Sequence, residues 1–470
     1  MSEEKIERSP SPSEVGFRLT RRKFVITGAG AVGAAAFLAA CGSDSGDETT
    51  TDTAADEDAD TTEETAAPAE DDTGEEATDE PSGDLGEVTF GSNFSDEKPK
   101  AAMAAAIAAT GLNVKINTVD HNTYQENFNT YIQQPDDVVS WFAGYRMRAF
   151  ASKGVVGDIS DVWGGLSGFG EGFKSASSGL DGKQYFVPFY FYPWAVHYRK
   201  SLFEEKGYAI PTTWDEFKAL CDQMQADGVT PLCAANDGRW PQMGMFDMIN
   251  LRTNGYDFHV SLMGGQEDWT SDAVKQVFTN WTELLGYYQP DANGRTWQDA
   301  ANALGDKSAG MFLLGTFVTS NFDGDTQADI IDDIDFFLFP EIDPAHGQDA
   351  IEAPIDGFMM AASPANEEGA KALLAGLGTA TAEDAYIAVD PSVVGANNDT
   401  DTSGYNALQQ KSAEAVGSAK YIAQFLDRDT DPDFAANVVG VGIADFLAGP
   451  DNIDAILADI EAKKQTYTFE

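Results

Sequence analysis

The chain has 470 residues, enough for two or three domains of ordinary size. Its 78 acidic side chains outnumber its 29 basic ones, and the formal net charge of -49 excludes binding to nucleic acid or anionic lipid through a basic surface, since both require clustered Lys and Arg. With 42% hydrophobic and 11% aromatic residues the chain can form a large core, so disorder can affect only part of it.

Residues 1–40 have the pattern of a bacterial export signal. Arg21 and Arg22 precede an uncharged run over 24–40 that is short and rich in Ala and Gly, which suits a signal peptide better than a stable membrane span. The arginine pair resembles the twin-arginine signal for export in the folded state. The run ends in LAAC, which resembles a lipobox, so Cys41 is expected to receive lipid and to become the first mature residue. The alternative is an uncleaved anchor helix.

An acidic spacer is predicted for residues 41–86. From Gly42 to Gly86 the chain has 18 Asp and Glu residues and no Lys, Arg or aromatic residue. Such a segment cannot bury enough apolar surface to offset the entropy cost of ordering it, and its like charges keep it extended. We therefore expect a disordered tether between the lipid and the folded part, with an acidic tail that binds a partner as the alternative.

The folded part is expected to begin near Glu87 with alternating strands and helices. This alternation is typical of a parallel sheet whose loops gather at the carboxyl edge of the strands, where α/β folds bind ligands. The expected strands cover 87–94, 114–119 and 137–141, and the expected helices cover about 100–110 and 124–132.

An aromatic stretch then marks a change of direction. Residues 185–194 read YFVPFYFYPW, with seven aromatic residues and two prolines, and proline interrupts a central strand. We interpret this stretch as a crossover between two lobes whose rings partly line a cleft. A buried core strand is the alternative.

A well-marked helix follows the crossover. Thr213 is its expected N-cap, Glu216 completes a capping box, and Gly228 ends it. Cys221 lies on this helix and Cys233 on the next expected strand. In an exported protein the two could form a disulfide, and two buried free thiols are the alternative.

The remaining elements return to a mixed pattern. A helix is expected over 271–285, strands over 311–318, 334–339 and 355–362, and helices from about residue 367 onward. A chain that leaves a lobe, builds another and comes back forms two discontinuous lobes around a hinge. The expected α/β lobe 1 holds 87–192 and 310–362, and the expected lobe 2, a mainly helical α/β unit, holds 193–309 and 363–470.

Two long stretches carry a resemblance to a known family. Residues 110–163 (TGLNVKINTVD to VGDISDVW) and 181–234 (DGKQYFVPFYFYPW to TPLCA) resemble the family 1 extracellular solute-binding proteins of ABC importers, in the branch that carries sugars. The resemblance extends over Glu87 to Glu470. It implies a two-lobed periplasmic-binding-protein fold of type II, in which a hinge closes the lobes around a sugar or oligosaccharide that is then delivered to a membrane permease.

Candidate ligand contacts combine aromatic rings, which pack on the C–H faces of sugars, with planar polar groups for the hydroxyls. By resemblance, the segments of Trp240 and Asp356 match places where family members contact sugar. A helix cap for Trp240 and a simple turn for Asp356 are the alternatives. The full set of candidates is Asn93, Asp120, His121, Trp141, Tyr145, Arg146, Trp194, Arg239, Trp240, Phe317, Asp356 and Gly357.

Motifs of common hydrolases are missing from the sequence. It contains no HExxH zinc helix, no phosphate loop and no G-x-S-x-G turn, and its four histidines are far apart. We therefore expect a receptor with no catalytic residue, cofactor or metal. We expect a monomer whose partners are the sugar and the ABC permease, with no nucleic acid, held at the outer face of the cell membrane by lipid on Cys41. The alternatives are a receptor for a polyamine or other small cation, and a secreted carbohydrate-active enzyme.

Overall fold

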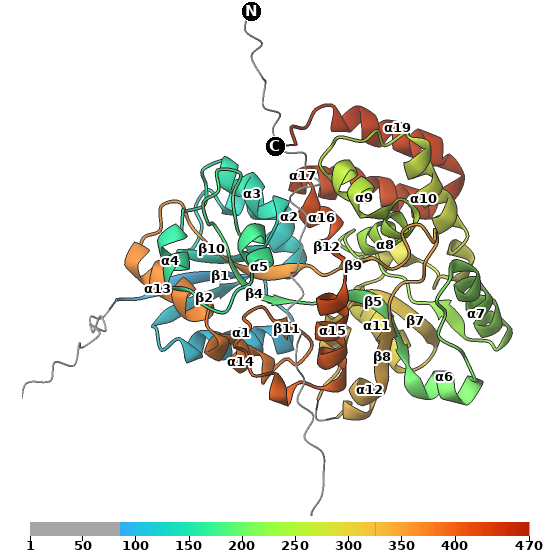
Figure 1. Ribbon diagram of the computed structural model, residues 1–470, viewed down its shortest axis with the longest axis horizontal. Helices are drawn as coiled ribbons and strands as arrows, with labels where there is room; N and C mark the ends of the chain where they lie inside the picture. Colours follow the sequence, from blue (N-terminus) through green and yellow to red (C-terminus); the bar gives the residue numbers. More distant parts are fainter. Residues whose placement is uncertain (1–84, 325, 470) are drawn as a thin grey trace, which may run out of the picture. The chain divides into compact units, whose positions relative to one another are not determined.

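A computed structural model describes residues 85–324 and 326–469 of the chain (Figure 1). The predicted export signal at Arg21 and Arg22, the predicted lipidation site Cys41 and the predicted acidic spacer up to residue 84 lie outside the described residues. Among the described residues, no helix combines the length and the apolar character needed to cross a membrane.

The first lobe is built on a six-stranded sheet in the order β11-β4-β10-β3-β1-β2. β1 pairs in parallel with β2 and β3, which confirms the parallel start predicted from the alternating pattern, whereas β10 and β11 pair antiparallel with their neighbours. The strands are β1 (Val88–Ser92), β2 (Val114–Thr118), β3 (Val138–Phe142), β4 (Val187–Phe191), β10 (Ile355–Met360) and β11 (Val394–Gly395). The helices are α1 (Glu97–Ala109), α2 (His121–Tyr131), α3 (Tyr145–Ser152), α4 (Ser160–Gly165), α5 (Glu171–Ala176), α13 (Glu367–Leu377) and α14 (Ala380–Ile387).

The second lobe contains a four-stranded sheet in the order β6-β7-β5-β8, surrounded by more helices than the first. Its strands are β5 (Trp194–Arg199), β6 (Thr230–Leu232), β7 (Ala309–Gly315) and β8 (Ile334–Phe337). Its helices are α6 (Lys200–Lys206), α7 (Trp214–Ala226), α8 (Met243–Thr253), α9 (Gly255–Met263), α10 (Asp272–Thr282), α11 (Trp297–Gly305), α12 (Ala328–Asp333), α16 (Leu426–Asp429), α17 (Pro432–Phe434), α18 (Gly440–Ala448) and α19 (Ile453–Lys464). Short turns of other helix types lie at η2 (Leu285–Tyr287), η3 (Ala292–Gly294), η4 (Thr316–Asn321), η6 (Ala435–Val439) and η7 (Pro450–Asn452).

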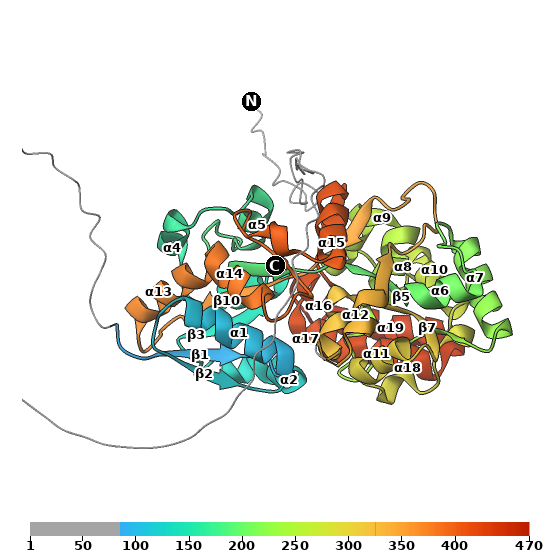
Figure 2. The same cartoon turned by 90° about the horizontal axis from the view of Figure 1, so that it is seen from below.

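Three passages of the chain connect the lobes. The first runs from β4 directly into β5, which confirms a crossover at the aromatic stretch. The second runs from β9 (Ala350–Glu352) into β10, and the third passes through η5 (Thr402–Gly404) and α15 (Ala407–Ser418) to β12 (Tyr421–Ala423). β9 and β12 pair in parallel, and α15 lies between the two groups of helices in both views (Figures 1 and 2). Such paired connections are suited to hinge motion.

The lobe boundaries differ from those predicted. β7 and β8, which fall in the segment 310–362 assigned to lobe 1, instead pair with β5 in the second sheet. Conversely, α13 and α14 fall in the segment 363–470 assigned to lobe 2, but they pack on α1 and the first sheet. The sequence of a strand does not show which strand it pairs with. The chain was therefore predicted to return to lobe 1 at β7, whereas it returns only at β10.

The helix predicted from Thr213 is confirmed as α7. The Thr213 side chain accepts a hydrogen bond from the Glu216 backbone N–H, and Glu216 completes the capping box. The disulfide predicted on this helix is wrong: Cys221 and Cys233 are both buried free cysteines. Each thiol lies in the apolar core of the second lobe, where burial raises its pKa and disfavours the reactive thiolate.

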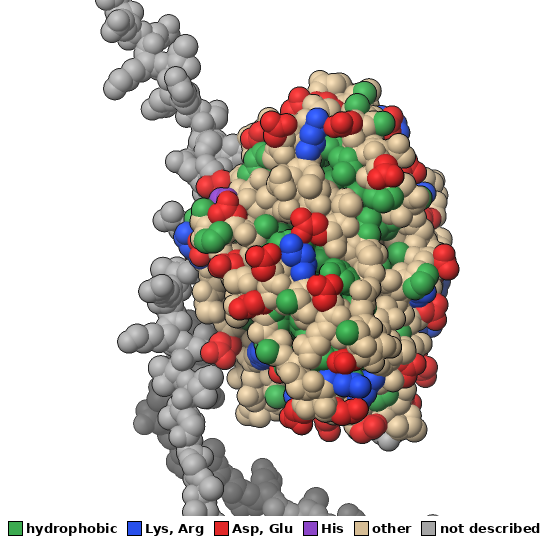
Figure 3. Space-filling view, turned by 90° about the vertical axis from the view of Figure 1, so that its right-hand side faces the viewer, with side chains coloured by type: hydrophobic (Ala, Val, Ile, Leu, Met, Phe, Trp, Pro, Cys, Tyr) green, Lys and Arg blue, Asp and Glu red, His purple; other side chains and the backbone are tan. Residues whose placement is uncertain are grey.

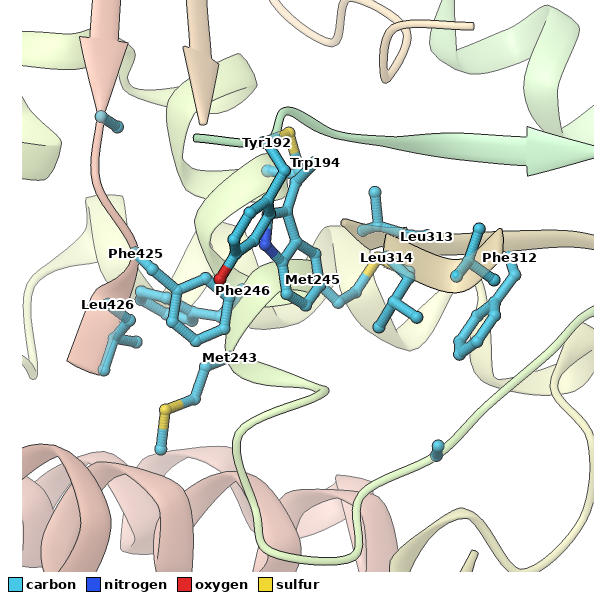
Figure 4. Packing of buried hydrophobic residues seen from close by; sticks show 14 of the residues in the cluster. Tyr192, Trp194, Met243, Met245, Phe246, Phe312, Leu313, Leu314, Phe425 and Leu426 are labelled. Atoms are coloured by element: carbon cyan, nitrogen blue, oxygen red, sulfur yellow. The ribbon is translucent and has the colours of Figure 1, made fainter. Parts of the chain in front are cut away.

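Aromatic residues dominate the packing beneath the cleft. The Trp194 ring lies 4.7 Å from that of Phe425 (centroid to centroid) and near Tyr192, as Figure 4 shows.

Acidic side chains are spread over the face seen in Figure 3, with few Lys and Arg among them. On this face the acidic side chains are therefore solvated.

Candidate functional site

A cavity of about 290 Å³ lies between the two lobes. It lies beside the carboxyl ends of β1 and β4 and the start of β10, and the second lobe closes it with β5, the loop after β6, η4 and α11. Its lining is a mixture of aromatic rings and polar side chains. The residues are Asn93, Phe94, Ser95, Asp96, Pro99, Asp120, His121, Asn122, Gln125, Tyr190, Tyr192, Trp194, Asp237, Trp240, Thr296, Trp297, Gln298, Phe317, Ser320, Asp356, Tyr386, Asp390, Ser392, Val393, Phe425, Asp427 and Arg428.

One wall of the cavity is aromatic. Trp240 meets Trp194 at right angles with 6.2 Å between ring centroids, and it lies 6.1 Å from Phe317. Phe317 in turn meets Trp297 edge to face at 5.4 Å. Trp194 is buried and Trp240 is half-buried, so the Trp240 ring keeps a surface that can pack against a ligand.

A polar wall of the cavity is organised by Arg428. Its Nη1 lies 2.9 Å from Asp356 Oδ1, its Nη2 donates to the Tyr192 hydroxyl at 2.9 Å, and its guanidinium lies 4.0 Å from the centroid of the Phe142 ring. Burial opposes the charge of Arg428, but Tyr192, Asp356 and Asp427 outweigh this effect and hold its pKa above the usual value. The guanidinium is thus a fixed cation with a planar row of donors.

A second buried pair supports the first. Arg146 Nη1 lies 2.8 Å from Asp427 Oδ2 and donates to Gln125 Oε1 at 2.7 Å. The Arg146 guanidinium also lies 4.7 Å from the centroid of the Trp141 ring. Breaking such a pair would leave an uncompensated buried charge, which is costly. The pairs Arg428–Asp356 and Arg146–Asp427 therefore hold each other's side chains in place and form one rigid polar surface.

His121 adds a neutral ring to the cavity lining. The ring contacts the Gln125 amide, and Nδ1 lies 3.3 Å from Asn93 Nδ2. Burial, with Arg428 and Arg146 nearby, lowers the pKa of His121 to about 4, so the ring is neutral near pH 7. Asn93 is fixed by the Ser140 hydroxyl, which donates to its Oδ1 at 2.8 Å. Neutral donors and acceptors of this kind match ligand hydroxyls.

Side chains from opposite lobes meet around the cavity. Trp240 Nε1 donates to Asn122 Oδ1 at 3.3 Å, Lys98 Nζ donates to the Phe322 carbonyl at 2.7 Å, and Gln298 Nε2 donates to Asp96 at 3.3 Å. These contacts join α1 and α2 to elements of the second lobe, so the lobes touch across the cleft.

Seven of the predicted contact residues line this cavity. They are Asn93, Asp120, His121, Trp194, Trp240, Phe317 and Asp356. Within this set Asp120 also has a structural role, because it caps α2 by accepting the Thr123 N–H at 3.0 Å.

The other five predicted residues lie elsewhere. Arg146, Trp141 and Arg239 line an adjoining cavity, and Trp141 is a core residue stacked on Phe128 at 3.5 Å. Tyr145 begins α3 and lines neither cavity. Gly357 lies within β10, where an added Cβ would overlap the Val187 carbonyl and the Phe186 ring. Its glycine is required by close strand packing and not by a turn.

Sequence reasoning missed the residue that organises the site. Arg428 lies in the segment LDRDTD, which contributes none of the predicted contact residues. The useful signal was a lone arginine among acids in a chain with few basic residues. Tyr190 and Tyr192 also line the cavity and lie in the predicted aromatic crossover, but they are not among the predicted contact residues. Within the part of the chain that the structure describes, no group of His, Cys, Asp and Glu could hold a metal ion.

The chain is similar to known extracellular solute-binding proteins. The model of the family described as bacterial extracellular solute-binding protein matches residues 92–384. Among solved structures, the chain is similar to the bacterial solute receptor AcbH, with 44% identity, a TM-score of 0.78, and coverage of 81% of this chain and 99% of that chain. AcbH is described as having an exclusive substrate preference for β-D-galactopyranose.

Curated relatives are more distant. The chain is 22% identical over 297 residues to an uncharacterised ABC transporter extracellular-binding protein of Pyrococcus horikoshii, covering 61% of this chain and 64% of the relative. It is 28% identical over 190 residues to a probable sugar-binding periplasmic protein of Mesorhizobium japonicum, covering 39% of this chain and 45% of the relative. Less than two thirds of the length of either relative is therefore matched.

Proposed function

Because the chain belongs to the family of bacterial extracellular solute-binding proteins, we propose that its interlobe cavity binds a sugar, with galactose as the leading candidate, for delivery to an ABC importer. The observation that carries this proposal is the pairing of an aromatic wall at Trp240 with the fixed polar wall of Arg428 and Asp356. A pyranose ring has an apolar face that can pack on the aromatic wall, and hydroxyl groups that can form hydrogen bonds with the polar wall.

Galactose is chosen on the similarity to AcbH. At 44% identity and 99% coverage of that chain, similarity extends over the whole receptor. The cavity of about 290 Å³ is at the lower limit of small-ligand sites, which favours a single sugar ring.

The proposed mechanism is closure around a hinge. Asp356 lies on β10, directly after the second connection, and Arg428 follows β12, at the end of the third. Both side chains therefore lie next to the segments that must bend when the lobes move. Ligand contacts that exist only in the closed form shift the population towards closure, and the permease then recognises that form.

A small cation is the second candidate ligand. Asp96, Asp120, Asp237 and Asp390 also line the cavity, and Arg428 and Arg146 neutralise only Asp356 and Asp427. Carboxylates together with aromatic rings can hold a polyamine. Catalysis is not proposed, because the relatives found are binding proteins.

A ligand panel tests the proposal directly. The full chain is screened by thermal shift against galactose, glucose, maltotriose and spermidine, and each stabilising ligand is then titrated by calorimetry. Galactose at about 100 times its Kd should stabilise the folded form by roughly 2.7 kcal/mol. Stabilisation by spermidine alone would favour the cation receptor, and turnover of a sugar would identify an enzyme. Binding of none of these compounds contradicts the proposal.

Location and anchoring are proposed on the sequence. Lipid on Cys41 and the acidic spacer would hold a monomeric receptor at the outer face of the membrane, after export through the arginine pair Arg21 and Arg22. Mass spectrometry of the mature N-terminus checks this: wild type should begin with a lipidated cysteine, and Cys41→Ser should be released from membranes. A Cys41→Ser protein that remains membrane-bound would show another anchor.

A further inference from the structure

A second cavity of about 310 Å³ adjoins the first. Arg146 lines it, with a side chain that is 4% exposed and an Nε atom that has no hydrogen-bond partner. Trp141, Asn129 and Asn437 also line this space. Like the first cavity, it combines an accessible aromatic ring, that of Trp240, with planar polar groups, the chemistry that suits a sugar ring.

The two cavities share four lining side chains. These are Asn122, Gln125, Trp240 and Asp427. The hydrogen bond from Trp240 Nε1 to Asn122 Oδ1, at 3.3 Å, crosses from the second lobe to the first. We call the pair Asn122 and Trp240 the partition. Because its halves belong to different lobes, the partition is complete only when the lobes approach each other.

Neighbouring groups hold the Asn122 half in place. A Cβ added to Gly238 would lie 2.8 Å from Asn122 Oδ1, so the loop backbone before Trp240 passes directly against this side chain. Gly238 has a φ of +73°, which glycine adopts without strain. On the same helix, Gln125 is held by Arg146 Nη1 at 2.7 Å. The partition is therefore a packed contact with fixed geometry.

We propose that the partition determines specificity by limiting the ligand to one sugar ring. This inference rests on the sugar-receptor function proposed above. A second hexose attached to a sugar in the first cavity reaches the second cavity by passing between Asn122 and Trp240, which line both cavities. It must break their hydrogen bond and hold the lobes apart, so a disaccharide forfeits the cross-lobe contacts that favour closure. Removing the Asn122 side chain widens the passage between the cavities and lets the second ring reach Arg146 and the Trp240 ring from the side of the second cavity.

Calorimetry on the full chain tests the partition. The probes are galactose and two disaccharides: lactose, in which galactose is extended from C1, and β-1,4-galactobiose, which offers one galactose extended from C1 and one extended from C4. Wild type should bind galactose at least tenfold more tightly than either disaccharide. In Asn122→Ala the ratio of disaccharide Kd to galactose Kd should fall at least tenfold for one of them. Asn127→Ala, on the exposed face of the same helix, is the matched control and should keep the wild-type ratio.

A second variant asks whether the added ring occupies the second cavity. In the Asn122→Ala background, Asn437→Trp fills that cavity and should restore the wild-type ratio. The partition is refuted if wild type binds a disaccharide as tightly as galactose, if Asn122→Ala leaves the ratio unchanged, or if Asn437→Trp does not reverse the gain. If wild type binds none of the three sugars, the proposed function itself has failed.

Discussion

The Arg428 guanidinium forms an ion pair with the Asp356 carboxylate across 2.9 Å, although the two residues are 72 positions apart in the chain. Asp356 is the second residue of β10 in the first lobe and Arg428 lies on α16, so the pair joins the ends of two interlobe connections. Both side chains are buried. The pair therefore links the polar wall of the cavity to the hinge.

Replacing Asp356 with Asn should impair both binding and stability. The variant keeps the side-chain shape but removes the carboxylate nearest to the buried Arg428 charge, which should lower the free energy of unfolding by about 3 kcal/mol. Galactose affinity should fall at least tenfold, because the polar wall loses its charge. Chemical denaturation and calorimetry measure the two effects. The control is Asp451→Asn, an exposed change outside both cavities, which should alter neither the unfolding free energy nor the galactose affinity. An unchanged galactose affinity in Asp356→Asn would show that Asp356 is not part of the binding site.

Two helical glycines should respond to alanine in opposite directions. A Cβ on Gly244 of α8 would overlap the Trp194 ring, so Gly244→Ala should displace the aromatic wall, weaken galactose binding and destabilise the fold by about 1–3 kcal/mol.

Gly417 of α15 has open space around it, and Gly417→Ala should stabilise the fold by roughly 0.5–1 kcal/mol through helix propensity. Thermal denaturation with and without galactose measures the stability and the ligand-induced stabilisation of each variant. If Gly244→Ala changed both as little as Gly417→Ala does, the packing of Gly244 against Trp194 would not hold the aromatic wall in place.

Stability should decrease as pH rises because of Asp247, a fully buried residue of α8. Its Oδ2 accepts the Leu426 N–H at 2.7 Å, and His259 Nδ1 lies 3.9 Å from Oδ1. Burial raises the pKa of Asp247 to about 7 despite the proximity of His259, and the carboxyl groups of Asp427 and Asp429 act in the same direction. The folded state thus holds a proton that the unfolded state has released. The contribution is complete below pH 4 and is lost as pH rises through 7.

Asp247→Asn should remove this part of the pH dependence. Between pH 5 and pH 8 the unfolding free energy of wild type should fall relative to that of the variant, by at most about 1.4 kcal/mol per pH unit. Urea denaturation at several pH values measures the difference. Asp445→Asn, an exposed residue of α18, is the control with the wild-type slope. Parallel curves for wild type and Asp247→Asn would mean that Asp247 is charged in the folded state throughout.

The two core thiols should react only after unfolding. Cys221 and Cys233 are buried, and burial raises the pKa of both, so an alkylating reagent should spare them in the native chain. In denaturant without reductant both should be alkylated, as peptide mass spectrometry can show. A cross-linked peptide containing both cysteines would instead demonstrate the disulfide that the structure lacks.

Ligand binding should reduce the dimensions of the protein in solution. Contacts such as Lys98 to Phe322 and Asn122 to Trp240 join the lobes around the cavity and are available only when the lobes are close. Small-angle scattering should therefore give a smaller radius of gyration with saturating galactose than without it. Identical curves would contradict hinge closure.

The local order of the chain was predictable because its signals are short in range. The Thr213 capping box, the alternation over 87–141 and the crossover at 185–194 each depend on residues close in sequence, and each was confirmed. Trp240 and Asp356 were predictable for a different reason. Their segments resemble places where members of the family contact sugar, and both residues line the cavity.

What the sequence by itself determined is therefore a two-lobed α/β receptor with an aromatic cleft. Only the tertiary structure decided that β7 and β8 belong to the second sheet, that Cys221 and Cys233 stay apart as free thiols, and that Arg428 organises the site. The physical reason is the same in each case. Strand pairing, thiol geometry and buried ion pairs depend on segments that folding brings together from distant parts of the chain. Arg428 looks like a surface residue among acids until Asp356, Tyr192 and Phe142 surround it.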